Sequence, residues 1–174
     1  MSFYPSEFST ATTKYTGPLA IVSWDGPRNA ENQMHGSGTI VFASGAVFVG
    51  DVVNDMLDGE GEMRDAGSSS VYKGGWVEDR REGRATFTTP YGSYEGQYLN
   101  NKRHGAGKET DAQGNVTEGE WTEGVLTRGK VSYSNGDIYI GQLNDSSERH
   151  GQGKLLTADG DVMDGQWVED EFAD

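Results

Sequence analysis

The chain has 174 residues, with 28 acidic and 14 basic side chains, a net charge of -14 and no cysteine. This charge argues against binding to nucleic acid or to anionic lipid, because both carry phosphates that an acidic surface repels on average. The lack of cysteine excludes disulfides, thiolate metal sites and a cysteine nucleophile.

Glycine and aromatic residues dominate the rest of the composition. The chain holds 26 glycines, four tryptophans, eight tyrosines and six phenylalanines, although hydrophobic residues make up only 33% of it. So many aromatic residues are unlike a disordered chain. An elongated fold with little interior would reconcile the three observations.

The first segment, residues 1–19, lies outside the repeats that follow and contains Phe3, Tyr4, Phe8 and Tyr15. It has neither the basic region nor the apolar region of a signal peptide, and nothing in the chain approaches 18 consecutive apolar residues. We therefore expect a cytoplasmic or cytoskeletal location. The segment is either a flexible leader or a clip anchored on a partner.

Residues 20–168 repeat at intervals of 22 to 24 residues. A central glycine marks each copy, and the glycines are Gly50, Gly74, Gly96, Gly119, Gly141 and Gly165. A degenerate first copy begins at Ala20 and has Val22 in the central position. With that register, all four tryptophans fall in one column, two residues after the centre.

A Gly-x-Gly motif follows the first half of most copies, as in Gly105-Ala106-Gly107 and Gly151-Gln152-Gly153. We interpret the motif as the bend that leads into a return strand, because glycine permits positive φ and close backbone approach. Tight turns such as Asn135-Gly136 then lead to the next copy. Each copy is thus one β-hairpin.

Strand alternation separates two faces of the predicted sheet. One face is aromatic. The opposite face is polar, except at Ile21, Val49 and Ile140. The sequence therefore predicts an all-β fold: an elongated, single-layer antiparallel sheet, a solenoid of about seven hairpins.

The repeat resembles the MORN repeat, with Tyr94-Glu95-Gly96-Gln97-Tyr98 followed by His104-Gly105-Ala106-Gly107 as its best match. The copy at 115–136 departs from the pattern, with Thr117 in the tyrosine column, and is expected to be less regular. The resemblance implies a structural or adaptor protein of the cytoskeleton, most specifically of radial spokes in the axoneme of cilia and flagella. It also implies protein partners, either a helix in the aromatic groove or a second copy bound through a terminal repeat.

The aromatic face is the candidate partner-binding groove, because a single-layer sheet has no second layer to cover it. Its residues are Trp24, Phe48, Tyr72, Trp76, Tyr94, Tyr98, Trp121, Tyr139 and Trp167. The alternative is that these rings only pack across strands and stabilise the sheet.

No catalytic, metal or cofactor site is predicted. His35, His104 and His150 occupy the same position of three different copies, so neighbouring repeats separate them beyond the reach of one metal ion. The basic clusters Arg80-Arg81 and Lys102-Arg103 are interpreted as solvated turns. Clustered carboxylates are interpreted as solvated loops, since general acid–base catalysis needs a desolvated pocket.

The last residues, 169–174, form an acidic tail that is judged too short for a return strand. An open sheet edge there would invite a partner unless charge protects it. Two other functions remain open: a membrane-associated adaptor that binds phosphoinositide, and a binder of a motor or kinase tail helix. Neither a membrane nor nucleic acid is the favoured partner.

Overall fold

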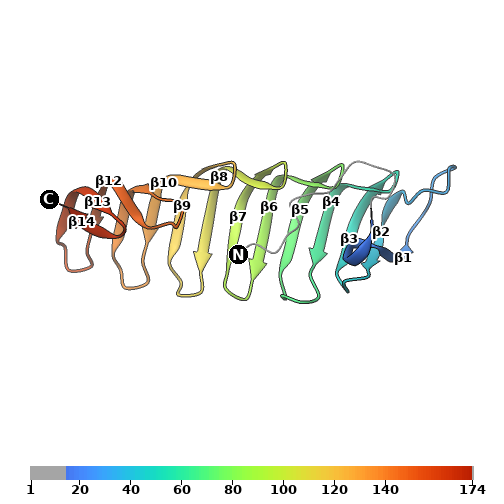
Figure 1. The fold of residues 1–174 in the computed structure, drawn as a ribbon, viewed down its shortest axis with the longest axis horizontal. Helices are drawn as coiled ribbons and strands as arrows, with labels where there is room; N and C mark the ends of the chain where they lie inside the picture. Colours follow the sequence, from blue (N-terminus) through green and yellow to red (C-terminus); the bar gives the residue numbers. More distant parts are fainter. Residues whose placement is uncertain (1–14, 174) are drawn as a thin grey trace. The chain divides into compact units, whose positions relative to one another are not determined.

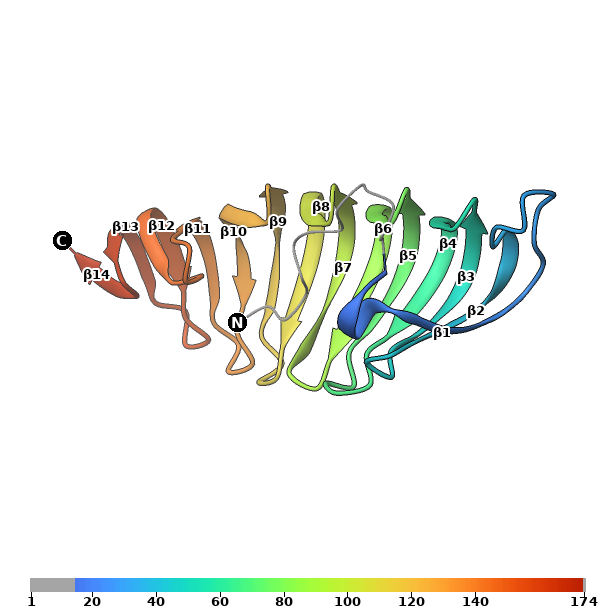
Figure 2. The ribbon, with the colours of Figure 1, turned by 45° about the vertical axis from the view of Figure 1, so that its right-hand side comes forward.

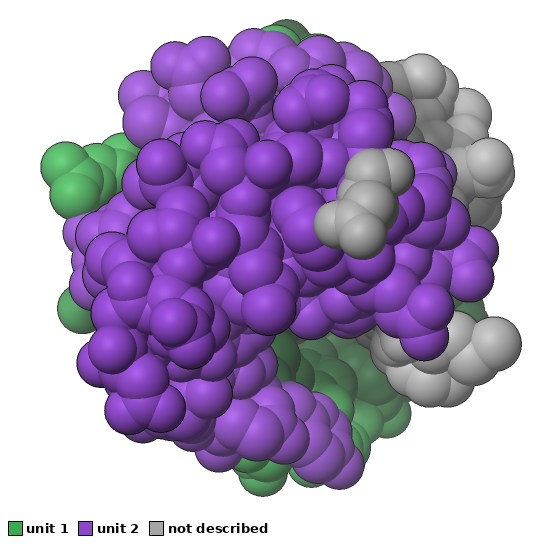
Figure 3. All heavy atoms as spheres, turned by 90° about the vertical axis from the view of Figure 1, so that its left-hand side faces the viewer, with its two compact units in different colours: residues 1–90, 98–101 green, residues 91–97, 102–174 purple. Residues whose placement is uncertain are grey.

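The structure is a computed structural model that describes residues 15–173. The chain divides into two compact units, with residues 1–90 and 98–101 in unit 1 and residues 91–97 and 102–174 in unit 2 (Figure 3). The described residues form one short 3-10 helix, and all their other regular elements are β-strands (Figure 1). The predicted all-β class is confirmed. None of the described residues forms a helix long and apolar enough to cross a membrane.

Unit 1 consists of antiparallel strands in chain order. Its elements are η1 (Gly17–Leu19), β1 (Ile21–Asp25), β2 (Gly36–Phe42), β3 (Val47–Val53), β4 (Met56–Arg64), β5 (Val71–Val77) and β6 (Arg80–Thr89). Each strand from β1 to β5 pairs with the strand that follows it in the sequence. Figure 2 shows η1, in dark blue, in front of the strands of unit 1.

Unit 2 continues the same arrangement. Its strands are β7 (Gly92–Leu99, of which the last two residues belong to unit 1), β8 (Lys102–Asp111), β9 (Val116–Thr122), β10 (Val125–Ser132), β11 (Ile138–Leu143), β12 (Arg149–Leu156), β13 (Val162–Val168) and β14 (Glu171–Ala173). From β8 onwards each strand pairs antiparallel with its successor. The predicted row of β-hairpins is confirmed in both units.

Two-residue turns join the two strands of a repeat. Asn54 and Asp55, between β3 and β4, have φ values of 49° and 65°, and Glu78 and Asp79, between β5 and β6, have 47° and 66°. Positive φ at both central residues is typical of a type I′ turn, whose twist matches that of a hairpin. The prediction of this bend at Gly-x-Gly is wrong.

The Gly-x-Gly motif instead lies within the return strand, next to a β-bulge. In β12, Gly151 has a φ of 65°, and the pairing with β11 shifts register between Gly141 and Leu143. The second glycine, Gly153, lies directly under the ring of Tyr139, where a side chain has no room. The first glycine therefore bends the strand, and the second makes space for a ring.

The turns between repeats are as predicted. The amide of Gly136 donates to the carbonyl of Tyr133 at 3.0 Å, and Gly136 has a φ of 97°. Gly160 repeats this geometry, with its amide 3.0 Å from the carbonyl of Thr157.

The copy at 115–136 is less regular at its bulge, as expected: two residues, Thr127 and Arg128, lie opposite Glu120, whereas three lie opposite Asp51 in unit 1. The hairpin pairing itself is kept. Trp121 pairs with Leu126 in the way that Val52 pairs with Leu57 in unit 1. Thr117 occupies the tyrosine position without changing the register.

The register of the first repeat was predicted wrongly. Trp24 pairs with Ile40, which on its other side pairs with Phe48, so Trp24 belongs to the column of Phe48. The indole N–H of Trp24 donates to the carbonyl three residues on, that of Pro27, at 2.9 Å. Gly26, packed against the indole, is therefore the central residue in place of Val22. The tryptophan column holds Trp76, Trp121 and Trp167, and not all four.

The end of the described chain also differs from expectation. Residues Glu171–Ala173 form the return strand β14, in which Phe172 pairs with Trp167. The two rings meet edge to face with centroids 5.1 Å apart. The prediction that this tail is too short for a return strand is wrong, because three residues after a two-residue turn are enough to place one ring.

Candidate functional site

The predicted groove residues lie inside the sheet's core. Phe48, Tyr72, Tyr94 and Tyr139 are at most 1% exposed, and the column beside them is at most 5% exposed at Trp76, Tyr98, Trp121 and Trp167. Only Trp24 among the nine is half-buried. The rings therefore pack across strands, as the alternative reading predicted, and offer little bare aromatic surface. Their role in binding a partner stays a prediction.

The buried tyrosines that lie two residues before a central glycine donate their hydroxyl to a carbonyl beside the bulge. Tyr139 donates to the carbonyl of Gln142 at 2.7 Å, and Tyr72 donates to that of Gly75 at 3.1 Å. The ring reaches this carbonyl because it lies flat across the central glycine. Burial raises the pKa of Tyr72 and of Tyr139 above the ordinary value of a tyrosine, so both rings stay neutral. In the repeats that carry it, the Tyr-x-Gly spacing thus fits the ring to the glycine and the hydroxyl to the carbonyl.

The rings contact one another edge to face within each unit. In unit 1 the centroid of Tyr72 lies 5.1 Å from that of Trp76 and 5.2 Å from that of Tyr98. In unit 2 the distance is 5.2 Å between Tyr94 and Trp121. Such pairs contribute about 0.5–1.5 kcal/mol each beyond the area that they bury. The ladder of rings therefore connects successive repeats.

Three arginines cover these rings, and we call them the lid arginines: Arg81, Arg103 and Arg149. The guanidinium carbon of Arg149 lies 4.4 Å from the centroid of Trp167, and that of Arg103 lies 4.6 Å from that of Tyr94. Arg81 lies over Tyr98 at 5.2 Å. Stacking of this kind is a cation–π interaction. Arg81 and Arg103, interpreted as parts of solvated turns, thus lie on the aromatic face.

The sequence carried a signal for the lid arginines. They share one position of the repeat, near the start of the return strand, with Leu57 and Leu126, which are 1% and 8% exposed. A position that alternates between arginine and buried leucine indicates a side chain whose stem covers apolar surface.

The lid arginine Arg103 also explains an irregular residue. Two residues after the second position of the Gly-x-Gly motif, the return strands carry an apolar side chain, but β8 carries Glu109 there. The carboxylate of Glu109 lies 3.0 Å from the guanidinium of Arg103, with side chains 37% and 28% exposed. The charge of Glu109 is therefore paired at the edge of the aromatic face.

Side chains of the hairpin turns fasten neighbouring repeats together. The Asp79 carboxylate accepts a hydrogen bond from the amide of Leu57 at 2.7 Å, and the amide of Asp79 donates to the carbonyl of Leu57 at 2.9 Å. Asn101 makes the same pair of bonds to Arg81, at 2.9 and 3.1 Å. We call this two-bond arrangement a turn clasp. Asp55 and Asp170 make it too, with Met34 and Arg149.

Tyr15, from the segment before the repeats, lies on the turn clasp of Asp79. Its hydroxyl donates to Oδ1 of Asp79 at 2.8 Å, and its ring centroid lies 5.9 Å from that of Phe42. Burial and the neighbouring Asp79 charge raise the pKa of Tyr15 above its ordinary value. Sequence reasoning named Tyr15 as part of a segment that either is flexible or forms a clip. No periodic signal connects it to a turn 64 residues away.

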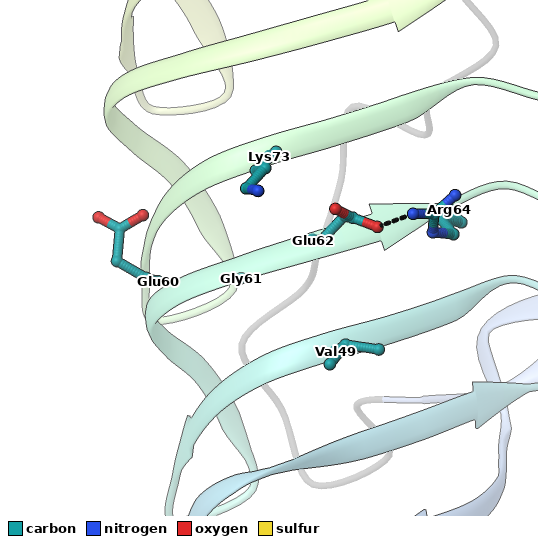
Figure 4. Close-up of a pocket in the computed structure, with 6 residues that line it drawn as sticks. All are labelled: Val49, Glu60, Gly61, Glu62, Arg64 and Lys73. Atoms are coloured by element: carbon teal, nitrogen blue, oxygen red, sulfur yellow. Dashed lines mark ion pairs between the residues drawn. The ribbon is translucent and has the colours of Figure 1, made fainter.

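The opposite face is mostly polar, as predicted. Its exceptions Val49 and Ile140 are about half exposed, at 50% and 51%. In unit 1 a shallow hollow on this face is lined by Val49, Glu60, Gly61, Glu62, Arg64 and Lys73 (Figure 4). Arg64 pairs with Glu62 at 2.5 Å, so the charges lining the hollow largely balance.

Within residues 15–173, no group of three histidine or acidic side chains could hold a metal ion. We call the aromatic face with its lid arginines the ring face. It consists of guanidinium groups stacked on rings, bordered by the carboxylates and amides of the turns.

Comparison with known proteins identifies the repeat. A family model described as MORN repeat matches residues 30–47, 48–69, 72–93, 94–116 and 147–162. The chain is 30% identical over 144 residues to alsin of Homo sapiens, which is 79% of this chain and 8% of alsin. It is 28% identical over 129 residues to alsin of Rattus norvegicus, 71% of this chain and 7% of that protein. The chain thus spans less than a tenth of the length of these relatives.

Among solved structures, the chain is similar to the TCP domain of SAS-4 in complex with a proline-rich motif of Ana2, from Drosophila melanogaster. The TM-score is 0.49 at 7% sequence identity, and the match covers 80% of this chain and 76% of that chain.

Proposed function

Because the chain belongs to the family of MORN-repeat proteins, we propose that it is a non-enzymatic scaffold that binds protein partners through its ring face. MORN repeats suggest a scaffold or a membrane-binding adaptor. The observation that supports the protein-binding role is the row of lid arginines, which places the same recognition group on several repeats. We further propose a place in a cytoskeletal assembly, most specifically in an axonemal radial spoke.

The lid arginines define what a partner would meet. The guanidinium of Arg149 stacks on Trp167 and donates to the carboxylate of Asp170 at 2.9 Å, which holds it in place. A planar guanidinium fixed in this way recognises carboxylates or backbone carbonyls with little loss of side-chain entropy. The proposed partner is therefore a helix or extended segment that carries such groups.

A matched pair of substitutions tests the ring face. Arg149→Leu removes the guanidinium and introduces leucine, the residue that other repeats carry at this position as Leu57 and Leu126. Arg128→Leu is the control, because it removes the same charge from the opposite, polar face of unit 2. Tagged full-length variants would be purified from ciliated cells and their bound proteins quantified.

We expect Arg149→Leu to lose partners by about tenfold, in line with the loss of one charge-assisted hydrogen bond, and Arg128→Leu to keep them. Equal partner recovery by the two variants would rule out the ring face. Localisation of the same tagged chains tests the second part, since a diffuse cytoplasmic signal in ciliated cells would rule out the axonemal assignment alone.

The family match also favours a second candidate, a membrane-associated adaptor that binds phosphoinositide. The net charge of -14 opposes it. Binding to vesicles that increases with phosphoinositide content and decreases with salt would support it over the first. A third candidate, a binder of a motor or kinase tail helix, differs from the scaffold in requiring one helical ligand per chain. A homodimer through a terminal repeat would give twice the 18.9 kDa mass of the chain in light scattering.

A further inference from the structure

Residues 15–20, which we call the clip, are held on unit 1 by bonds outside the strand ladder. The amides of Ala43 and Ser44, in the turn after β2, donate to the carbonyls of Ala20 and Pro18 at 2.8 and 2.9 Å. Tyr15 forms the other end of the clip, where its hydroxyl meets Asp79. The clip therefore connects the turn between β2 and β3, at one end of the strands, with the turn clasp of Asp79 between β5 and β6, at the other end.

The clip ends in a defined pocket for a tyrosine. Asp79 is 1% exposed, and the carboxylate oxygen that accepts the Tyr15 hydroxyl also accepts the Leu57 amide at 2.7 Å. The Tyr15 hydroxyl lies 3.3 Å from the carbonyl of Asp55 as well. Phe42, against the ring, is 3% exposed. An apolar wall with a carboxylate at its end has the chemistry to bind a phenol side chain.

The corresponding residue of unit 2 shows what the clip changes. Asp170 makes the same turn clasp with the amide of Arg149, yet its side chain is 48% exposed. Burying a carboxylate costs free energy unless donors replace the water that it loses. At Asp79 the hydroxyl of Tyr15 supplies such a donor. A side chain that covers Asp79 therefore needs a hydrogen-bond donor, which the phenol of a tyrosine provides.

We propose that the pocket formed by Phe42 and Asp79 is a docking site for a tyrosine on an extended protein segment, and that the clip occupies it in the free chain. This inference rests on the proposed protein-binding function and names the partner chemistry for unit 1. A partner segment that carries a tyrosine competes with Tyr15. Because the clip lies outside the strand ladder, it opens without disturbing the sheet, as segments of low local stability do.

Hydrogen exchange on the full chain tests whether the clip opens by itself. The amides of Ala43 and Ser44 report on the clip, and the amide of Gly45 is a control because it donates within its own turn, to Phe42 at 2.8 Å. We expect Tyr15→Ala to accelerate exchange at Ala43 and Ser44 by about tenfold or more, the value of one hydrogen bond to a charged group. Exchange at Gly45 should not change.

Tyr15→Phe keeps the ring and removes only the hydroxyl, so it should accelerate the same two amides by a smaller factor. Unchanged exchange at Ala43 and Ser44 in Tyr15→Ala would overturn the clip. Acceleration that includes Gly45 to the same extent would overturn it too, because it would show that the whole turn has loosened.

Binding of a peptide in trans tests the docking site. The probe is a synthetic peptide of residues 12–20, with the same peptide carrying phenylalanine at position 15 as its control. We expect the first peptide to bind full-length Tyr15→Ala at least about tenfold more tightly than the unsubstituted chain, whose pocket is filled. Adding Asp79→Gly to Tyr15→Ala should remove binding, and the turn should persist because Gly124 fills the same place in unit 2.

Equal binding to the filled and emptied pockets, or no binding to either, would overturn the docking site. So would equal binding of the tyrosine and phenylalanine peptides. These outcomes are separate from a failure of the proposed function, because Arg149→Leu tests that function in unit 2, whereas the clip belongs to unit 1.

Discussion

The turn between β5 and β6 in unit 1 and the turn between β9 and β10 in unit 2 share one backbone geometry and differ in one side chain. Asp79 fastens its repeat to Leu57 through its own amide and its carboxylate, at 2.9 and 2.7 Å. Gly124 makes only the first kind of bond, from its amide to the carbonyl of Arg103 at 2.9 Å, because it has no side chain. The backbone of the turn is therefore enough to form the repeat, and the side chain of the turn determines how strongly neighbouring repeats are joined.

The largest effect is expected when unit 1 is made like unit 2. Asp79→Gly removes the acceptor of the buried Leu57 amide and the nearer acceptor of the Tyr15 hydroxyl, which should cost about 3 kcal/mol of unfolding free energy. Urea unfolding followed by tryptophan fluorescence measures it. Asp170→Gly is the control, and should cost about 1 kcal/mol because solvent replaces the lost acceptor at an exposed site. Equal losses at the two turns would contradict the role of burial.

The second effect concerns the lid arginines, which the chain replaces by leucine in some repeats. Arg103→Leu should cost about 1.5 kcal/mol, because it removes the stacking on Tyr94 and leaves Glu109 without its partner. Adding Glu109→Val copies the apolar pair of Leu126 and Val131, and should restore stability to within about 0.5 kcal/mol. A double-mutant cycle by thermal or urea unfolding measures the coupling. A double variant no more stable than Arg103→Leu would show that the lid stabilises through stacking alone.

The column of rings could be predicted from the sequence because its cause is local. A ring two residues before a glycine, repeated every 22 to 24 residues, requires only strand alternation and space above the glycine. The first repeat was misplaced because tryptophan replaces tyrosine there. Trp24 then matched the tryptophan column by residue type, whereas its spacing to Gly26 matches the tyrosine column. Position relative to the glycine decides the register, and residue type does not.

The lid arginines and the clip could not be predicted in the same way. Charge alone assigned Arg81 and Arg103 to solvent, although the hydrocarbon stem of arginine covers rings as leucine does. Tyr15 meets Asp79 across 64 residues, and a single contact at that separation leaves no periodic trace. The burial of the rings depends on the bend at each bulge, on the lid arginines and on the clip. Strand alternation in the sequence therefore predicted which face the rings occupy, but not how exposed they are.

The third prediction uses the pH dependence of stability to test the clip, which only unit 1 carries among the described residues. Burial and the Asp79 charge, with Asp55 also near, raise the pKa of Tyr15 in the folded chain above the ordinary value near 10. Above that pH the unfolded chain loses the proton that the folded chain keeps, so stability falls as pH rises. Between pH 9 and 10.5 we expect Tyr15 to account for about 1 kcal/mol of the loss. In urea unfolding, the unfolding free energy of Tyr15→Phe should therefore fall by about 1 kcal/mol less over this pH range than that of the unsubstituted chain. An identical pH profile for the two chains would contradict burial of the hydroxyl.

The smallest effect is expected when unit 2 is made like unit 1. Gly124→Asn supplies a side-chain acceptor for the amide of Arg103, as Asn101 does for the amide of Arg81 at 2.9 Å. Asparagine tolerates the positive φ of this position, which is 91° at Gly124 and 69° at Asn101. We expect a gain of about 0.5 kcal/mol, because a net hydrogen bond is partly offset by the backbone strain that glycine avoids. Hydrogen exchange at the Arg103 amide is the direct measurement, and it should slow by a few fold while exchange at Gly136 stays the same. If the Arg103 amide exchanges at its original rate, a side chain at this turn does not join the two repeats, and the clasp depends on neighbours that this turn lacks.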